Sequence, residues 1–284
     1  MLCDMHAHSV FSDGTYTPKE LVDKAIENGL SAVALTDHNT VEGLPDFISA
    51  ARGKNIEIVL GSEFSADYNG KELHILGLFI PPSCFDMITG TLESINMRKE
   101  ESNIALVEAL ARAGYTLDYE RIKASTPNGR VNRSQIATAL LEKGYVKTQN
   151  EAFDTLLSKK TGYYKEPKRF DVGEVIKLIR SIGAVCVLAH PFLNLSEEEL
   201  IELLTTTDGF DGIECYYSSY DRETTDKSLR IAERFGLLKS GGSDFHGTAK
   251  PDIELGAGRG ELRIPYEWYL DLKKRAEKTS GRTP

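Results

Sequence analysis

The spacing of apolar positions divides the chain into short buried strands separated by amphipathic helices. Seven apolar runs have the length of a strand and are bounded by polar residues or glycine, which is typical of strands buried in an α/β sheet. The first predicted strand begins near residue 1 and leads into DMHAH. The other six are SAVALTDH, IEIVLGSEF, ELHILGLFI, AVCVLAH, FDGIECYY and LLKSGGSD. Alternation of this length predicts a parallel sheet, either open or closed into a barrel.

Helical segments separate most of these strands. Thr17, Pro18 and Glu20 supply an N-cap, a proline at the first helical position and a capping-box partner, and Gly29 marks the end of that helix. Further helices are predicted near residues 41–52, 172–182, 196–204 and 222–235. From residue 92 to 160 the pattern is helical throughout, with helices at 94–113, 133–143 and 148–159. We therefore predict one domain, residues 1–91 plus 165–284, with a helical insertion at 92–164 that forms part of the substrate site.

Polar side chains at the strand ends favour a closed barrel. Barrel enzymes keep their active sites at the carboxyl ends of all strands, whereas an open sheet binds ligands only near its switch point. Six of the predicted strands end in or just before such residues, which are His8, His38, Glu63, His190, Glu214, Asp244 and His246.

Charge and cysteine content narrow the class of protein. The chain has 34 basic and 43 acidic residues and a net charge of -9, which argues against a stable complex with DNA through a general positive field. Residues 121–170 nevertheless hold eleven basic and four acidic side chains; this indicates either a local anion site or a solvated helical face. The four cysteines are scattered without a C-x-x-C pair, and we expect neither a leader nor a membrane-spanning segment. We expect a cytoplasmic protein with reduced thiols and no membrane contact.

The histidines predict a metal centre. His6 and His8 are two residues apart on a strand, so their side chains face the same way and can bind one ion. A lone histidine at a strand end is usually a hydrogen-bonded core residue, but five of the six histidines lie at strand ends beside Asp, Glu or Pro. Together with Asp13, Glu63 and Asp244 they make nine candidate ligands, enough for two or three ions. The mixture of imidazole and carboxylate suits manganese, zinc or iron, and such centres are suited to phosphate ester hydrolysis.

These segments together resemble the PHP family, the polymerase and histidinol phosphatase domain. The resemblance rests on DMHAHS, SDG, TDH, GSE, His74, AHP and GSDFH, in that order, over nearly the whole chain. SDG and the helical insertion are most similar to stand-alone phosphoesterases that act on nucleoside 3',5'-bisphosphates and short RNA 5' ends. Histidinol phosphatases of the family usually carry histidine near the position of Asp13.

The resemblance implies a distorted seven-stranded (β/α)7 barrel and a trinuclear site. By position, His6, His8, Glu63 and Asp244 would hold the first ion, Asp13, His38 and His246 the second, and Glu63, His74 and His190 the third. Three further carboxylates are candidates for fixing imidazole orientation, namely Asp4, Asp37 and Glu214. For Asp4 and Asp37 a plain buried hydrogen bond accounts equally well for the residue.

The insertion is the predicted source of substrate contacts. GRVNRSQ resembles a family stretch in which an arginine precedes Pro-His at the start of a helix, which places Arg133 as a phosphate ligand with Arg130 nearby. Here Gln135 stands in place of the histidine, so it is expected to touch the substrate but cannot protonate a leaving group. The basic residue that often follows the HP motif is also missing from HPFLN.

The resemblance implies hydrolysis of a phosphate monoester by a hydroxide that bridges two ions. The expected partner is a small phosphorylated molecule, either a nucleotide of the 3',5'-bisphosphate type or a short RNA end. Three alternatives remain open: a histidinol-phosphate phosphatase, a metal-dependent amidohydrolase, which commonly uses a carboxylated lysine not seen here, and a non-catalytic metal-binding module.

Overall fold

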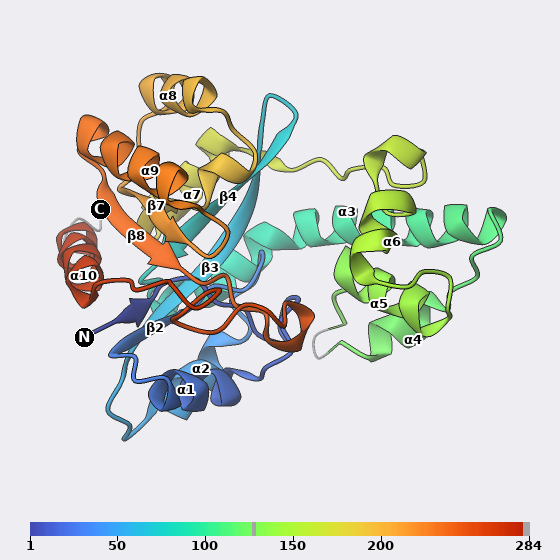
Figure 1. Ribbon diagram of the computed structural model, residues 1–284, viewed down its shortest axis with the longest axis horizontal. Coiled ribbons are helices and arrows are strands. Elements are labelled where there is room, and N and C mark those ends of the chain that lie inside the picture. The colour runs from blue at the N-terminus through green and yellow to red at the C-terminus, as the bar shows by residue number, and fades with distance from the viewer. Residues whose placement is uncertain (127–128, 281–284) are drawn as a thin grey trace.

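Seven strands form a barrel that closes between its first and last strands, and Figure 1 shows the helices around it. The computed structural model describes residues 1–126 and 129–280. Around the barrel the strands follow the order β1 (Cys3–Asp4), β2 (Ala32–Leu35), β3 (Glu57–Tyr68), β4 (Lys71–Leu78), β6 (Val185–Leu188), β7 (Gly212–Tyr217) and β8 (Leu238–Gly242). The Met5 amide donates to Gly241 (3.0 Å) and the Asp244 amide to His6 (2.9 Å), which joins the two edges. The distorted (β/α)7 barrel is confirmed.

One strand runs against the others, contrary to the predicted parallel sheet. β4 is antiparallel to both β3 and β6. Its connection to β3 is the two-residue turn Asn69-Gly70, in which φ is 53° and 78°. Two positive φ values are the signature of a tight β-hairpin turn, which needs no crossover helix. An eighth strand, β5 (Phe170–Asp171), pairs with β3 outside the barrel order.

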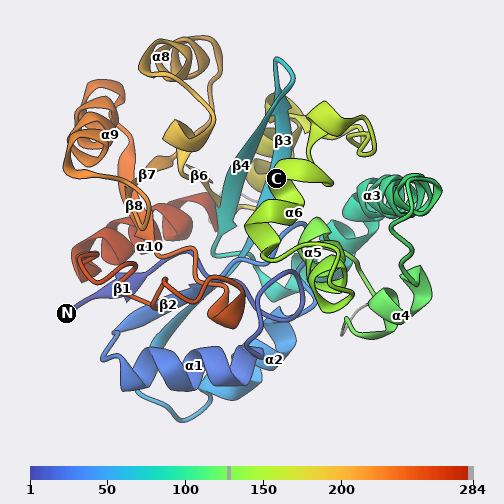
Figure 2. The same cartoon turned by 45° about the vertical axis from the view of Figure 1, so that its right-hand side comes forward.

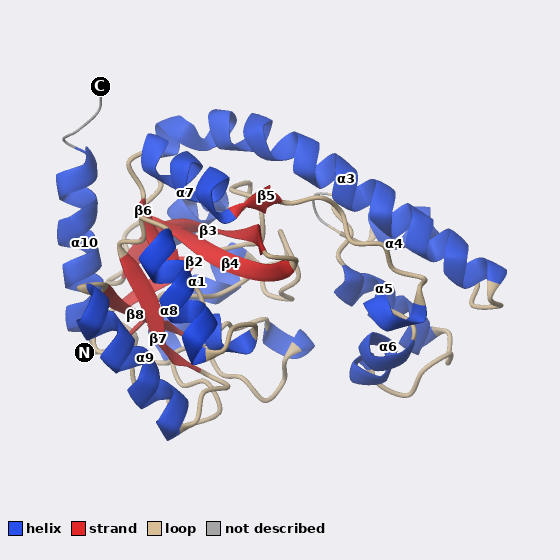
Figure 3. Ribbon diagram, turned by 90° about the horizontal axis from the view of Figure 1, so that it is seen from above, coloured by secondary structure: helices blue, strands red, loops and turns tan. Residues whose placement is uncertain are grey.

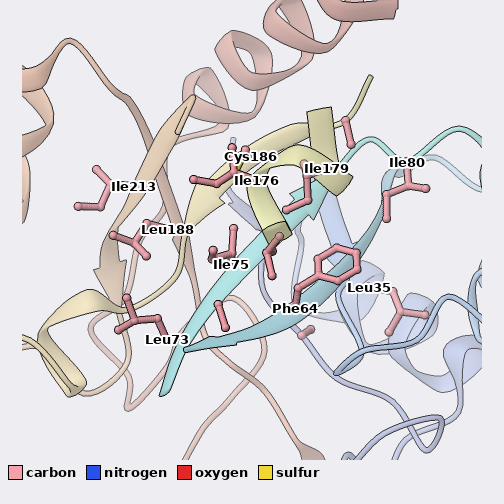
Figure 4. Close-up of a cluster of buried hydrophobic side chains, with 14 of the residues drawn as sticks. Leu35, Phe64, Leu73, Ile75, Ile80, Ile176, Ile179, Cys186, Leu188 and Ile213 are labelled. Atoms are coloured by element: carbon pink, nitrogen blue, oxygen red, sulfur yellow. The ribbon is translucent and has the colours of Figure 1, made fainter. Parts of the chain in front are cut away.

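Five helices pack around the strands: α1 (Pro18–Glu27), α2 (Leu44–Ala51), α7 (Val172–Ser181), α8 (Glu197–Thr206) and α9 (Arg222–Phe235). α1 begins with the predicted capping box between Thr17 and Glu20. Figure 4 shows the hydrophobic cluster beneath α7, where Ile176 and Ile179 lie against Phe64 and Ile75 from the β3–β4 hairpin. This packing fixes the hairpin and therefore the side chains that it carries.

A C-terminal helix that the sequence did not predict, α10 (Tyr266–Ser280), covers the end of the barrel where parallel strands begin (Figure 3). The Tyr269 hydroxyl donates to Glu57 at the start of β3 (2.9 Å). Arg275 donates to Asp211, just before β7 (2.8 Å), and Thr279 to the Gly183 carbonyl, just before β6 (2.7 Å). The carboxyl ends of these strands lie at the opposite end and remain free for a functional site.

The insertion is a helical lobe beside the barrel (Figures 1 and 2). It contains α3 (Phe85–Arg112), α4 (Tyr119–Ala124), α5 (Arg133–Glu142) and α6 (Gln149–Thr155). α3 starts earlier than predicted. Its first part packs on the barrel cluster through Ile88 and Leu92, whereas Leu106 and Leu110 join a separate cluster within the lobe. α3 therefore packs against both the barrel and the lobe, and the lobe has a hydrophobic core of its own.

Short 3-10 turns complete the secondary structure, at Pro82–Cys84, Lys159–Thr161, Pro191–Leu193 and Gly247–Ala249. Within residues 1–126 and 129–280, no helix combines the length and the apolar character that crossing a bilayer requires.

Candidate metal centre and adjoining cavities

All nine predicted metal ligands lie together at one end of the barrel. Their donor atoms form four overlapping groups, each within 4.8 Å: His8, Asp13, His38 and His246; His6, Glu63 and His190; His6, His8 and Asp244; and His38, Glu63 and His74. The groups overlap because several side chains, Glu63 among them, belong to more than one. The grouping differs from the predicted division among three ions, since His74 lies with His38 as well as beside Glu63.

The contact between β1 and β8 sets the first part of the centre. The Nε2 atoms of His6 and His8 lie 3.1 Å apart, and Asp244 Oδ1 is 3.2 Å from His8 Nε2. This approach requires a glycine at position 242, because a Cβ atom there would lie 2.1 Å from the Cβ of His6. The GSDFH segment thus brings Asp244 beside the histidines that follow β1.

Glu63 stands at the middle of the centre on β3. It is buried, and its Oε1 lies 2.8 Å from His74 Nδ1 and 3.0 Å from His190 Nε2. Its Oε2 lies 2.8 Å from His38 Nδ1 and 3.3 Å from His8 Nε2. The two oxygens therefore face different histidines, as a bridging carboxylate requires.

Three of these atoms are buried without a hydrogen bond. Among the described residues, His38 Nδ1, His74 Nδ1 and Glu63 Oε2 have no hydrogen-bond partner although close polar neighbours surround them. Buried polar atoms are almost always satisfied. Divalent cations bound at these lone pairs would satisfy the three atoms, and the nitrogen and oxygen donors suit manganese, zinc or iron. The residues present therefore fit the predicted metal ions.

The electrostatics of the cluster favour cations. Burial raises the pKa of Glu63, but the charges of His74 and His38 outweigh it and hold that pKa well below the ordinary value. Burial lowers the pKa of His8, yet the close carboxylates of Asp244 and Glu63 raise it to about 9. Burial also lowers the pKa of His74, but the negative charge of Glu63 outweighs burial and raises that pKa to about 10. The same carboxylates that retain these protons attract divalent cations in their place, which makes binding pH-dependent.

The three predicted supporting carboxylates have different contacts. Glu214 Oε1 lies 3.1 Å from His6 Nδ1, and its Oε2 accepts from the His190 amide (2.9 Å), so it contacts an imidazole as expected. Asp37 accepts from the hydroxyls of Ser9 and Ser12 (both 2.6 Å). These contacts order the loop that carries Asp13; they do not orient an imidazole.

Asp4 also binds backbone instead of a histidine ring. It accepts from the amides of His6 (3.2 Å), Ser243 (2.9 Å) and Gly256 (2.7 Å). The plain hydrogen-bonding interpretation therefore describes Asp4, and this residue ties β1 to the segments after β8.

Backbone strain accompanies the site. The φ angle is 24° at His190 and 54° at Asp244, and such conformations persist where function requires them.

Two cavities adjoin the ligands. The metal cavity, of about 320 Å³, contains Glu63, His190, Asp244 and a single lysine, Lys250, among its described lining residues. The cationic cavity, of about 240 Å³, is lined by Lys99, Arg133, Lys168 and Arg169. Both cavities share five lining residues, which are Asp13, His38, His74, Ser134 and Phe153. An extended ligand can therefore reach from the metal ligands to the basic residues.

Arg133 is the basic residue best placed to bind an anion. It is the first residue of α5, and its guanidinium lies 4.3 Å from the centre of the Tyr164 ring, a stacking contact that leaves its N–H groups available. It forms no ion pair within the described residues. Arg169, by contrast, binds Glu72 through two hydrogen bonds, of 3.0 and 2.8 Å.

The other two predicted substrate residues have different positions. Arg130 lines a neighbouring cavity and pairs with Glu42 (2.6 Å). Gln135 accepts from the Asn132 amide (2.7 Å) and donates to the Ser12 carbonyl (3.2 Å), while the Asn132 side chain donates to the same carbonyl (2.9 Å). Gln135 therefore caps α5 and docks it on the loop before Asp13, so its amide is already engaged.

Lys99, Lys250 and Tyr217 are among the polar residues at the site that were not predicted. Lys99 lies within the charged run MRKEES of α3, where no local pattern distinguishes it. Lys250 lies beyond the last motif. Tyr217 lines the metal cavity because a register irregularity between Glu214 and Tyr216 interrupts the alternation of β7. Such bulges redirect side chains, and apolar periodicity does not reveal them.

Sequence and structure comparisons relate the chain to known proteins. A model of the PHP domain matches residues 4–226. The chain is 30% identical to a 5'-3' exoribonuclease from Haemophilus influenzae, over 86% of this chain and 89% of the relative. It is also 30% identical to a 3',5'-nucleoside bisphosphate phosphatase from Chromobacterium violaceum, over 89% and 90% of the two chains. A crystal structure from Bifidobacterium adolescentis, assigned to the metal-dependent phosphoesterases, superposes with a TM-score of 0.85 at 30% identity and covers 96% of both chains. The family match and this agreement over nearly the full length show that the chain belongs to the PHP domain family.

Proposed function

We propose that this protein is a metal-dependent phosphoesterase that removes a phosphate monoester from a nucleotide carrying a second phosphate. The observation that carries the proposal is the junction of the metal cavity with the cationic cavity, through shared walls at Asp13, His38 and His74. The named relatives support it, since one acts on 3',5'-nucleoside bisphosphates and another is an exoribonuclease.

The proposed ligand sets follow the motif positions. His6, His8, Glu63 and Asp244 would hold one ion, Asp13, His38 and His246 a second, and Glu63, His74 and His190 a third. Bound divalent ions lower the pKa of a coordinated water and polarise a phosphoryl group. Glu63 supports this arrangement, because its two oxygens face different histidines.

The chain's own side chains orient the substrate. Arg133 donates to phosphate oxygens in a bidentate manner while Tyr164 holds its guanidinium plane. Lys99, whose amine contacts Asn132 in the same cavity, adds a second positive charge. A phosphate held there keeps the other end of the molecule at the metal cavity. The substrate therefore needs two anionic groups for tight binding.

Asp13 supports a nucleotide over histidinol phosphate. It lies 3.2 Å from His246 and 3.6 Å from His38 through different oxygens, so it fits a carboxylate ligand beside these two histidines, at the position where histidinol phosphatases usually carry histidine. A short RNA with a 5' phosphate offers the same two neighbouring anionic groups. It is the second substrate that we propose to test, because an exoribonuclease is among the relatives.

The test is a substrate panel on protein loaded with Mn²⁺. The panel contains adenosine 3',5'-bisphosphate, adenosine 3'-phosphate, a 5'-phosphorylated RNA oligomer, histidinol phosphate and an N-acyl amino acid. We expect phosphate release from the bisphosphate at a kcat/KM at least tenfold above that for the 3'-phosphate alone. Release of mononucleotides from the RNA would identify the exonuclease activity.

Two variants connect any activity with this centre. His8→Ala and Asp244→Ala are each expected to abolish phosphate release. Turnover that survives both substitutions, or cleavage of the amide substrate alone, would overturn the proposed function.

A further inference from the structure

The two oxygens of the Asp244 carboxylate have different partners. Oδ1 faces the histidines, 3.2 Å from His8 Nε2 and 3.4 Å from His246 Nδ1. Oδ2 accepts a hydrogen bond from the Tyr217 hydroxyl (2.9 Å) and another from the Lys250 amine (2.7 Å). Glu63 differs in this respect, because both of its oxygens face histidines.

We propose that Tyr217 and Lys250 are positioning residues that hold the outer oxygen of Asp244, so that this carboxylate offers one oxygen to a divalent cation while Glu63 offers two. The proposal rests on the proposed metal-binding function of the site. It adds two residues from separate segments, the end of β7 and the turn after β8, to a centre whose predicted ligands are His, Asp and Glu.

Tyr217 is fixed by its surroundings. Its side chain is buried, and its ring lies 5.0 Å from the His190 ring and 5.2 Å from the Tyr220 ring. The bulge in β7 turns it towards the centre. A rigid phenol of this kind loses little conformational freedom when it donates a hydrogen bond, so it is suited to fixing the direction of a ligand.

Lys250 complements the phenol with charge. Its amine neutralises the outer oxygen of Asp244 and is the only lysine or arginine nitrogen among the described lining residues of the metal cavity. A carboxylate oxygen occupied by two donors has little capacity left for a metal ion. With its outer oxygen held by these two donors, Asp244 would offer a single oxygen to an ion.

The test measures binding of Mn²⁺ alone, by competition with a chromogenic chelator, without any activity assay. Tyr217→Phe is expected to weaken Mn²⁺ binding about tenfold, the usual effect of losing a hydrogen bond to a metal ligand. Lys250→Met is expected to weaken it by a smaller factor, because it also removes a positive charge that repels the ions. Lys250→Arg keeps a donor and should restore binding close to that of the wild type.

Tyr220→Phe is the matched control. Its hydroxyl accepts from the Phe192 amide (2.9 Å) in the turn after β6, so its loss perturbs a neighbouring contact without touching Asp244. Mn²⁺ affinity is expected to stay at the wild-type value in this variant.

A double-mutant cycle separates positioning from a general loss of structure. If Tyr217 acts through Asp244, then Tyr217→Phe has no further effect on Mn²⁺ affinity when Asp244 is already alanine. An equal loss in both backgrounds, or unchanged binding in Tyr217→Phe, would overturn the inference while leaving the proposed function intact. Failure of the wild-type protein to bind Mn²⁺ would overturn both.

Discussion

His6 and His8 point their Nε2 atoms at each other across 3.1 Å. Two neutral imidazole nitrogens with lone pairs facing at this distance repel, so the pair is stable only with a shared proton or a shared cation. Glu63 and Asp244 surround the pair with negative charge. The folded chain thus holds a pair of donors that a divalent ion stabilises directly.

Metal removal should therefore lower stability. An ion that binds only the folded state adds about 4 kcal/mol to the free energy of unfolding at a free concentration a thousand times its Kd. We expect chelator-treated protein to unfold several degrees lower than protein supplied with Mn²⁺, as measured by calorimetry. His8→Ala should shrink that difference. A variant with the full Mn²⁺-dependent shift would show that His8 is not a ligand.

The cap of α5 should matter for substrate as well as for stability. Asn132→Ala removes the capping side chain, worth about 1 kcal/mol, and also a contact with the Ser12 carbonyl. We expect a raised KM together with a lower midpoint of urea unfolding. Thr148→Ala removes the cap of α6, which is not bonded to Ser12, and should lower stability at unchanged KM. Equal KM values in the two variants would argue against docking as the cause.

Substitution of Arg133 and substitution of Arg130 should have different effects on the KM for the bisphosphate. Arg133→Met removes donors that we assign to phosphate, and hydrogen bonds to charged groups are worth about 1.5–3 kcal/mol. The KM for the bisphosphate should therefore rise at least about tenfold. Arg130 is paired with Glu42 and partly exposed, so Arg130→Met should behave much like the wild type. The reverse order of effects would move the anion site to the neighbouring cavity.

Barrel closure should fail when Gly242 gains a side chain. Gly242→Ala would place a Cβ 2.1 Å from His6 Cβ, where neither backbone has room to move apart without losing the contact between β1 and β8. We expect severe loss of soluble folded protein, seen by circular dichroism. Gly90→Ala is the control, since its Cβ meets open space on α3; replacing a helical glycine there should stabilise the chain by about 0.5–1 kcal/mol.

The four thiols should differ in reactivity. Cys3, Cys186 and Cys215 are buried, and burial raises the pKa of Cys3 and of Cys215 to about 12. Thiolates are the reactive form, so a thiol reagent at pH 8 should modify only the half-buried Cys84 of the native protein quickly. Mass spectrometry checks this, with Cys84→Ser as the control. Rapid labelling at Cys186 in folded protein would contradict the buried assignment.

Much of the fold was predictable because buried strands leave continuous apolar runs. The seven predicted strands are the seven strands of the barrel, and the Thr17–Glu20 capping box was predicted correctly. The predicted direction of β4 was wrong, although Asn69-Gly70 is a strong hairpin signal. Alternation elsewhere suggested a crossover connection, and local turn chemistry prevailed over that regular pattern.

The candidate ligands were predictable for a different reason. Donor residues at strand ends converge in any closed barrel, so His38, His190 and Glu63 could be placed in one centre without knowing distances. Lys99 and Tyr217 could not be found in this way. One lies in a helix full of charges, and the other depends on a bulge. Roles that depend on long-range approach, such as that of Gln135, become visible only in three dimensions.

The proposed ligands of the centre are distributed along almost the entire chain, from His6 to His246. During synthesis the first histidines leave the ribosome long before Asp244 exists. A nascent chain therefore offers only a fraction of the donors and cannot retain a full set of ions. Binding of the full proposed set of ions must follow synthesis of the segment after β8, and a product truncated before that segment is expected to lack the ions that Asp244 and His246 would hold, however well its earlier segments fold.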